Sequence, residues 1–327
     1  MNRVFFIVGP TAVGKSELAA EVAGRLGAEI VSADAFQVYR GLDLLTAKPD
    51  QATLAKAPHH LIGTLPMSEE MNVEKYRAAA AKAIAEIQER GRSVIVVGGS
   101  GLYVKALTHG LAPLPAANRK LRDVLEQATI DELVRSLFAL DPAGAKMIDR
   151  QNKRRLIRAV EVCLLTGRPF SEQRTHWPQP PAVVAAAVTG GRRLDLATSS
   201  PLPPGTAAAT TGVFVYRDRA ELYARINQRV EQMFEAGVAE ELRGIGKVSE
   251  TAEKTLGLAD IRALLAGEIS QPVCIAKIQQ ATRRYAKRQL TWFQRQTNFA
   301  ALNLSAHGSS EAIELISQSA SRVFANG

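Results

Sequence analysis

The amino-acid sequence predicts an α/β fold: a core built around a parallel sheet, with a helical domain inserted into it. The first observation is the apolar run Val4–Val8, followed by a glycine-rich loop and then by a helical pattern that extends to Leu26. The second is residues 93–97, an unbroken run dominated by Val and Ile, which is typical of a strand buried on both faces. The third is the stretch 113–181, where the patterns are helical.

The loop after the first strand has the phosphate-binding spacing GxxxxGK[ST] and consists of Gly9, Pro10, Thr11, Ala12, Val13, Gly14, Lys15 and Ser16. In such a loop, backbone N–H groups surround a phosphate and the N-terminus of the next helix adds positive charge. Lys15 supplies a cation, and the Ser16 hydroxyl is a ligand for Mg²⁺. These residues predict a P-loop NTPase-like core that binds a phosphate or diphosphate.

The composition is that of a basic globular protein. The 327 residues suffice for two domains or for one domain with an insertion, and the hydrophobic share is 46%. The net charge of +9 favours an anionic partner, first of all nucleic acid, although a basic enzyme without such a partner has the same charge. Cys163 and Cys274 predict neither a disulfide framework nor a metal cage. With no signal peptide and no membrane-spanning run, we expect a cytoplasmic protein.

Changes of pattern along the chain predict three segments. Residues 1–112 form the first part of the core, and residues 113–181 form the helical insertion. Residues 182–327 complete the core, with a strand or a short helix at 182–188, a strand at 213–216 and a basic C-terminal helix. A stretch rich in Ser, Thr, Pro, Ala and Gly, residues 190–212, predicts an exposed, mobile loop.

Two polar side chains follow strands of the predicted sheet. Asp34 comes after the apolar stretch 29–33, and Ser100 follows the strand at 93–97. Because ligands of open α/β sheets bind at the carboxyl ends of the strands, we expect both near the P-loop ligand. Asp34 as a structural carboxylate and Ser100 as a helix N-cap are the alternatives.

The adjacent pair His59 and His60 lies in a short apolar stretch that predicts a buried strand at 58–62. Successive side chains of a strand point to opposite faces, so the two imidazoles do not easily share one metal ion.

Two predicted helices carry unbalanced positive charge. The first, at 153–166, has Lys153, Arg154, Arg155 and Arg158, with Glu161 as its single acid. The second, at 273–296, has no acid and carries Lys287 and Arg288 beside an apolar seam. Such helices either expose their charges to solvent or bind a sugar-phosphate backbone. The clustering of the charges favours the second interpretation.

Several segments together resemble the bacterial tRNA dimethylallyltransferase family. They are GPTAVGKS at 9–16, SADAFQVYRGLDLLTAKP at 32–49, PHHLI at 58–62, VGGSGLYVKAL at 97–107, LAPLP at 111–115, RRLIRAVEV at 154–162, RINQRV at 225–230 and TRRYAKRQLTWF at 282–293. They occur in the family's order over nearly the whole chain. Many enzymes share the P-loop, whereas TAKP, RRLIRAVEV and AKRQLTWF are far more specific.

The resemblance implies transfer of a dimethylallyl group from dimethylallyl diphosphate to N6 of the adenosine 3′ to the tRNA anticodon, with release of diphosphate. It implies that the P-loop and Mg²⁺ on Ser16 stabilise the leaving diphosphate, and that Asp34, as general base, and Ser100 are catalytic. The residues implied to contact the anticodon stem-loop are Asp34, Ala35, Phe36, Gln37, Ser100, Arg122, Arg154, Arg155, Leu156, Ile157, Arg158, Lys287 and Arg288. The insertion would clamp the anticodon stem, and we expect a monomer.

The sequence departs from the family pattern in a few places. Ala35 stands where the family has Ser, and Leu45 stands where Gly is expected. Two other enzymes stay open: a P-loop small-molecule kinase, with the arginines at 154–158 as a lid, and a prenyltransferase that acts on free adenine nucleotides. A non-catalytic RNA-binding protein is the third alternative.

Overall fold

The computed structural model describes residues 4–173, 212–296 and 298–325. The chain divides into two compact units, His109–Gln179 and the remainder. The strand or short helix predicted at 182–188 lies outside the described residues, and so does the predicted loop at 190–212 except for Gly212, the first residue of a strand.

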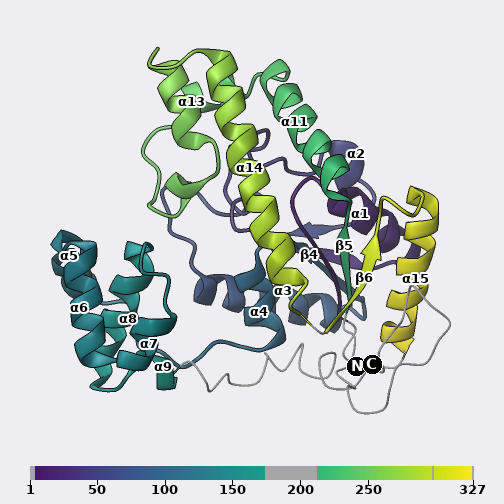
Figure 1. Cartoon of the computed structure of the whole chain (residues 1–327). Coiled ribbons are helices and arrows are strands. Elements are labelled where there is room, and N and C mark those ends of the chain that lie inside the picture. Colours follow the sequence, from purple (N-terminus) through teal and green to yellow (C-terminus); the bar gives the residue numbers. More distant parts are fainter. Residues whose placement is uncertain (1–3, 174–211, 297, 326–327) are drawn as a thin grey trace. The chain divides into compact units, whose positions relative to one another are not determined.

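The larger unit contains a six-stranded sheet in which every pair of neighbours is parallel. Its strands are β1 (Val4–Val8), β2 (Glu29–Ser32), β3 (His59–His60), β4 (Val94–Gly98), β5 (Gly212–Tyr216) and β6 (Phe299–Asn303), and their order is β3-β2-β4-β1-β5-β6. The P-loop therefore follows a strand in the interior of the sheet, flanked by β4 and β5 (Figure 1).

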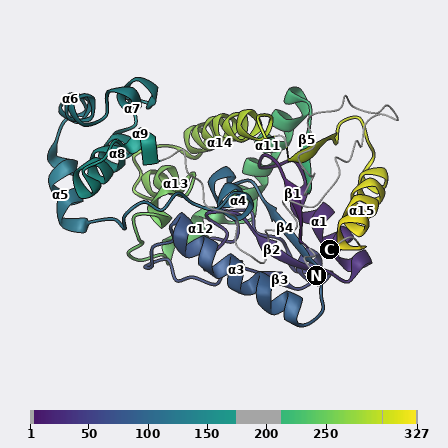
Figure 2. The same ribbon diagram turned by 90° about the horizontal axis from the view of Figure 1, so that it is seen from below.

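Helices cover both faces of this sheet, and the alternating residues of β1 show which face each helix covers. Phe5 and Ile7 pack with α1 (Lys15–Leu26), α11 (Arg219–Glu235) and α15 (Ser309–Ala325). Phe6 and Val8 pack with α3 (Val73–Glu89), α4 (Gly101–Thr108) and the end of α14 (Gln271–Phe293). Figure 2 shows this layered arrangement from below. Because the strands are buried on both faces, their sequences are continuously apolar.

A smaller cluster lies beside the sheet and involves α12 (Val238–Arg243), α13 (Leu258–Leu265) and the first part of α14. Leu42, Leu258 and Ile278 are buried in it. The short elements α2 (Gln51–Leu54) and η1 (Ala252–Lys254) complete this unit. None of its described helices, nor any in the other unit, is long and apolar enough to cross a membrane.

In the unit His109–Gln179, whose described part is residues 109–173, the secondary structure is helical and begins at Arg119. It consists of α5 (Arg119–Gln127), α6 (Ile130–Leu140), α7 (Pro142–Met147), α8 (Lys153–Thr166) and α9 (Phe170–Gln173). Its core includes Leu133, Leu137 and Val160, and Thr129 and Glu132 form a capping box at the start of α6.

Among the described strands, two differ from the prediction. The strand predicted at 58–62 is only two residues long, His59–His60. The strand β6 was not predicted, because its sequence FAALN lacks the β-branched run that marked β1 and β4.

Candidate functional site

The backbone geometry of the P-loop, between β1 and α1, requires glycine at two positions. Gly14 has a φ of +98°, in the left-handed region, directly before α1 begins. A Cβ at Gly9 would lie 2.2 Å from the carbonyl oxygen of Val215 in β5. One glycine is therefore required by a backbone conformation and the other by a close approach.

Lys15 is the central cation of this loop. Its ammonium group donates a hydrogen bond to the carbonyl oxygen of Pro10 at 2.6 Å. Burial lowers the pKa of Lys15 to about 8, the negative charge of Asp34 opposes this shift, and the positive charge of Arg229 adds to it. A buried cation whose pKa is lowered in this way gains most from an anion placed beside it.

Three arginines from the end of β5 and from α11 approach the same loop. Arg217 donates from Nε to the carbonyl oxygen of Val13, and Arg225 donates from Nε to that of Ala12, each at 3.0 Å. The Nε atom of Arg229 is buried and has no hydrogen-bond partner among the described residues. A buried donor without a partner is costly, and an anion bound in the cavity would supply the missing acceptor.

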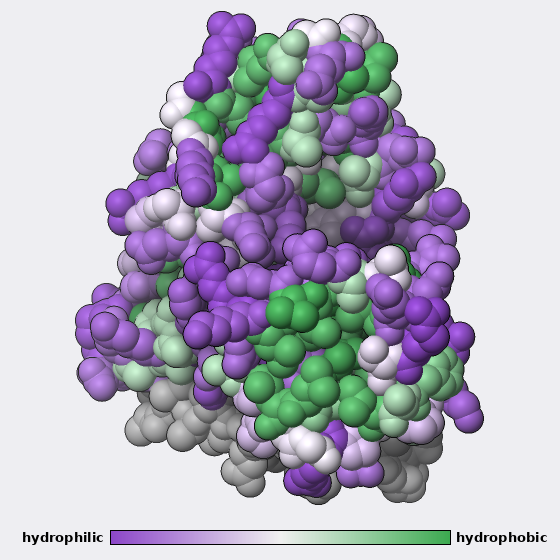
Figure 3. Space-filling model, turned by 90° about the vertical axis from the view of Figure 1, so that its left-hand side faces the viewer, coloured by the Kyte–Doolittle hydropathy of each residue, from purple (hydrophilic) through white to green (hydrophobic). Residues whose placement is uncertain are grey.

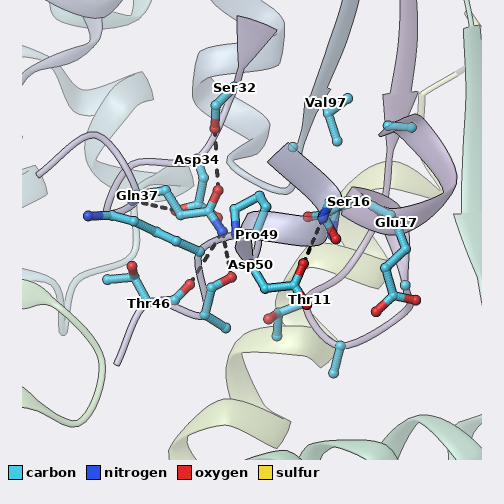
Figure 4. Close-up of a pocket in the computed structure, with 18 of the residues that line it drawn as sticks. Thr11, Ser16, Glu17, Ser32, Asp34, Gln37, Thr46, Pro49, Asp50 and Val97 are labelled. Carbon is cyan, nitrogen blue, oxygen red and sulfur yellow. Dashed lines mark hydrogen bonds between the residues drawn. The ribbon is translucent and has the colours of Figure 1, made fainter. Parts of the chain in front are cut away.

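Asp34 lies just beyond the end of β2, and Figure 4 shows it across the cavity from Ser16 at the start of α1. Its Oδ1 accepts hydrogen bonds from the backbone N–H groups of Phe36 at 2.9 Å and of Gln37 at 3.3 Å. Its Oδ2 accepts no hydrogen bond within the described residues. One oxygen therefore orders the turn, and the other is available to a ligand.

Ser100 is buried at the loop after β4, where its hydroxyl oxygen accepts a hydrogen bond from the N–H of Ala35 at 2.9 Å. The backbone N–H of Ser100 donates to the carbonyl oxygen of Ala33 at 3.2 Å. Burial raises the pKa of the Tyr285 phenol in α14, and its interaction with Ser100 opposes this shift. Ser100 thus ties the turn that carries Asp34 to the β4 loop.

Gln37 lines the cavity but uses its side chain within the protein. Its Nε2 donates to the carbonyl oxygens of Thr46 at 3.3 Å and Ala47 at 3.0 Å. Its Oε1 lies 3.5 Å from the hydroxyl of Ser32. Figure 4 shows Ser32, Asp34 and Gln37 together, with Thr46 below them. Both amide hydrogens are occupied, so Gln37 orders the cavity rather than presenting a free donor to a base.

Most of these groups surround one cavity of about 390 Å³, a size suited to a small ligand, whereas Ser100 and Arg217 do not line it. Its lining includes Thr11, Ala12, Gly14, Lys15, Ser16, Asp34, Gln37, Asp50, Arg225, Arg229 and Gln289. Oxygen donors of Ser16, Asp34 and Asp50 face it together with the cations, and hard oxygen ligands are those that Mg²⁺ prefers. The residues present therefore fit a magnesium ion bound with a phosphate.

Gln289 in α14 was not singled out from the sequence, yet it connects the two loops at the cavity. Its Oε1 accepts a hydrogen bond from the N–H of Thr11, and its Nε2 donates to the carbonyl oxygen of Gly99, both at 2.9 Å. A polar residue on a basic amphipathic helix has no sequence signal that distinguishes such a role. Arg225 and Arg229 lie in the segment RINQRV, and nothing in that pattern places them at the cavity.

The predicted RNA contacts on α14 are exposed. Lys287 and Arg288 border a hollow that is lined by Arg284, Lys287, Arg288, Thr291, Trp292 and Arg295. The guanidinium of Arg288 lies 5.7 Å from the centre of the Tyr285 ring. This face combines cations with an aromatic side chain, as surfaces that bind nucleic acid do.

In the helical unit, two side chains that were expected to contact RNA form hydrogen bonds within the protein. Arg122 donates from Nε and Nη2 to the two carboxylate oxygens of Glu161, both at 2.9 Å. Arg158 donates to Glu161 at 2.7 Å and to the carbonyl oxygen of Pro115 at 2.7 Å. The carboxylate of Glu161 is fully buried, so these arginines neutralise it, and only their partly exposed remaining surface is open to a ligand.

Leu156 and Ile157 require a correction. Their side chains are 0% and 2% exposed and belong to the core of the helical unit. They face inward because they lie on the apolar side of α8, whereas Arg154 and Arg155 on the other side are exposed. The side chains that can contact RNA on this helix are therefore the two arginines.

The surface of the helical unit is not uniformly basic. Its exposed large apolar side chains are Val124, Ile130, Met147, Leu164 and Leu165. Figure 3 shows an apolar patch on this unit among polar side chains.

The fold and the site define a P-loop α/β protein with a cationic cavity for a phosphorylated ligand, facing a carboxylate at the end of the neighbouring strand. The sequence profile of the IPP transferase family matches residues 37–296. The chain belongs to this family.

Individual relatives agree with the family assignment over nearly their full lengths. A protein of Akkermansia muciniphila named tRNA dimethylallyltransferase is 38% identical over 308 residues, which is 94% of this chain and 96% of the relative. The tRNA dimethylallyltransferase 1 of Citrifermentans bemidjiense is 40% identical over 89% of each chain.

The crystal structure of the full-length tRNA isopentenylpyrophosphate transferase of Bacillus halodurans superimposes with a TM-score of 0.66 at 31% identity, over 99% of this chain and 97% of that one. The predicted P-loop NTPase-like fold is thereby confirmed.

Proposed function

We propose that this protein transfers a dimethylallyl group from dimethylallyl diphosphate to N6 of the adenosine 3′ to the anticodon of tRNA, releasing diphosphate. The observation that carries the proposal is the composition of one cavity: Lys15 and Arg229 at the P-loop, with the carboxylate of Asp34 across from them. The family assignment and the names of the relatives support the same reaction.

In this reaction the bond between C1 of the donor and its bridging oxygen breaks, and a bond between C1 and N6 forms. Negative charge grows on the diphosphate as it leaves, and the P-loop N–H groups, Lys15 and Arg229 stabilise it. Asp34 accepts the proton that N6 loses, through its Oδ2. The hydrogen bonds from Phe36 and Gln37 to Oδ1 hold the carboxylate in place for this transfer.

A magnesium ion held by Ser16, with Asp34 or Asp50 nearby, would neutralise part of the diphosphate charge. This fits the oxygen donors of the cavity. Ser16 is the residue we assign to the metal, and its hydroxyl at the first turn of α1 is next to Lys15.

The polymer substrate is the tRNA anticodon stem-loop, gripped by basic side chains on both units. Arg154 and Arg155 on α8 and Lys287 and Arg288 on α14 are the exposed cations that we assign to its backbone. The target adenosine must leave its stack to reach Asp34, and pocket contacts offset that cost of a few kcal/mol. We expect the protein to act as a monomer in the cytoplasm, which light scattering of the purified protein and fractionation of cells would test.

The two alternative enzymes are less well supported. A kinase needs a γ-phosphate and an acceptor pocket, and the IPP transferase family assignment does not favour it. A prenyltransferase that acts on free adenine nucleotides does not need an RNA-binding surface. The exposed cations Arg154, Arg155, Lys287 and Arg288 outside the cavity would then have no role in the reaction.

The deciding experiment incubates the protein with labelled dimethylallyl diphosphate, Mg²⁺ and unmodified tRNA. We expect label in the tRNA and none in free adenosine monophosphate. Asp34→Asn keeps an oxygen that accepts from Phe36 and Gln37 but cannot take a proton, so turnover should fall by about 10²–10⁴-fold. Asp131→Asn, on the exposed start of α6, is the control. Label entering only free nucleotide, or ATP turnover without label transfer, would contradict the proposal.

A further inference from the structure

One loop at the edge of the diphosphate cavity is held by a carboxylate from outside that cavity. Glu241 in α12 accepts hydrogen bonds from the backbone N–H groups of Leu44 at 2.9 Å and Leu45 at 3.1 Å. The side chain of Leu45 is buried in the same cluster as that of Leu242, the residue after Glu241. Polar and apolar contacts therefore fix this short stretch against α12.

The residues that follow this stretch form part of the cavity lining: Thr46, Ala47, Lys48, Pro49 and Asp50. Gln37 holds the carbonyl oxygens of Thr46 and Ala47 from the other side. Ala47 has a φ of +48°, in the left-handed region that residues other than glycine rarely adopt. Such a conformation persists only where the surroundings impose it. The side chains of Gln37, Thr46, Lys48 and Glu241 all form hydrogen bonds that hold this loop.

We infer that Glu241 is a positioning residue for diphosphate binding: its carboxylate fixes the loop 44–48 and thereby the shape of the cavity opposite the P-loop. The inference rests on the proposed function for the identity of the ligand. Glu241 does not itself line the cavity, so its influence passes through the backbone of Leu44 and Leu45.

A purely electrostatic role of Glu241 and a positioning role predict opposite changes in anion affinity when the residue is replaced. Removing a negative charge near an anion-binding cavity strengthens anion binding through Coulomb's law alone. Releasing the loop weakens binding, because the lining residues must then be ordered by the ligand. The sign of the effect therefore identifies the cause.

The test compares Glu241→Gln with Glu240→Gln. In Glu241→Gln, the side-chain amide has one oxygen and one NH₂ group facing the N–H groups of Leu44 and Leu45. One hydrogen bond is therefore lost, and the NH₂ group lies against an N–H donor. Glu240 is the neighbouring, exposed residue, and it forms a 3.8 Å ion pair with Arg243. Its replacement removes the same charge without removing a hydrogen bond to the loop.

The readout is the dissociation constant of inorganic pyrophosphate with Mg²⁺, measured by calorimetry at fixed ionic strength. We expect Glu241→Gln to bind about tenfold more weakly and Glu240→Gln to stay within about twofold of the wild type. In steady state, KM for dimethylallyl diphosphate should rise while kcat at saturation and KM for tRNA change little. Glu241→Asp, which keeps the charge but has a shorter reach, should lie between the wild type and Glu241→Gln.

Pyrophosphate binding by Glu241→Gln that equals or exceeds the wild type would overturn the inference. Thermal unfolding of each variant is measured first, and if Glu241→Gln does not fold, the same criterion applies to Glu241→Asp. The pyrophosphate measurement needs no transfer reaction. A wild-type protein that binds pyrophosphate but leaves tRNA unmodified would refute the proposed function and leave the role of Glu241 standing.

Discussion

The side-chain oxygen of Gln289 lies 2.9 Å from the backbone nitrogen of Thr11, so α14 is bonded directly to the P-loop. The amide nitrogen of the same side chain donates to Gly99 in the loop after β4. One amide group therefore fixes the distance between the loop that would hold the diphosphate and the loop that carries Ser100. A Cβ at Gly99 would lie 2.3 Å from this amide nitrogen, so the close fit leaves no room for a side chain.

Replacing Gln289 by Leu should separate these two loops. Both buried hydrogen bonds are lost, the N–H of Thr11 and the carbonyl of Gly99 lose these partners, and we expect unfolding to become easier by about 1–3 kcal/mol. The ratio kcat/KM for dimethylallyl diphosphate should fall by about 10–100-fold, because the leaving group is no longer held in register with Asp34.

Gln280→Leu, on the exposed side of the same helix, is the control for this change and should leave both quantities unchanged. Gln289→Leu with the stability and the kinetics of the wild type would remove Gln289 from the site.

Lys15 makes the stability of the ligand-free protein depend on pH. Its pKa is lowered to about 8 by burial, so between pH 8 and 10.5 the folded state binds fewer protons than the unfolded state. Stability rises with pH in that window, and the cost of keeping Lys15 charged below pH 8 is on the order of 3 kcal/mol. Lys15→Met should therefore stabilise the ligand-free protein at pH 7 while abolishing pyrophosphate binding.

Denaturant unfolding of wild type and Lys15→Met at pH 7 and pH 9.5 measures this effect. The difference between the two proteins should shrink at the higher pH and should reverse in sign at pH 7 once pyrophosphate is added. Equal stability of the two proteins at pH 7 without ligand would contradict the explanation.

The parts of this site that could be predicted from the sequence are those encoded by neighbouring residues. The P-loop is a contiguous motif, and Asp34 follows a strand whose carboxyl end must meet the ligand in a parallel sheet. Local pattern also indicated β4 and Ser100. These predictions depend on short-range spacing and on one general rule of sheet topology.

Residues contributed by other parts of the chain could not be predicted in this way. Gln289, Arg229 and Glu241 are polar positions on amphipathic helices, and periodicity assigns such positions to solvent. What brings them inward is the packing of α11, α12 and α14 beside the sheet, which depends on strand order and on contacts between distant segments. The pairing of Glu161 with Arg122 is of the same kind, since the two residues lie on different helices.

Glu161 should control the stability of the helical unit. Burial would raise the pKa of its carboxyl, but hydrogen bonds from Arg122, Arg158 and the N–H of Asn118 more than offset this and lower the pKa below its ordinary value. The stabilisation is therefore present above about pH 4.5 and is lost as pH falls through the folded-state pKa. Glu161→Gln leaves two guanidinium groups without a countercharge and should cost about 3–5 kcal/mol.

Denaturant unfolding between pH 3 and pH 7 tests this role of Glu161. The wild type should lose stability on acidification more steeply than Glu161→Gln, and Glu126→Gln, an exposed change on α5, should follow the wild type. If Glu161→Gln and wild type are equally stable at pH 7, the cluster does not hold the unit together.

The salt dependence of tRNA binding should distinguish arginines that contact phosphate from arginines that support the fold. Arg154 and Arg288 are exposed, so replacing either with Ala should leave the fold intact, weaken binding, and lower the slope of log K against log salt by about 0.7–1. Arg122→Ala should instead destabilise the helical unit, because Glu161 loses its bidentate partner. Arg25→Ala, on α1 with an exposed ion pair to Glu314, is the control for loss of one charge. If the salt-dependence slopes of all four variants equal that of the wild type, α8 and α14 do not bind the tRNA backbone. The tRNA would then have to be bound by contacts at the cavity alone.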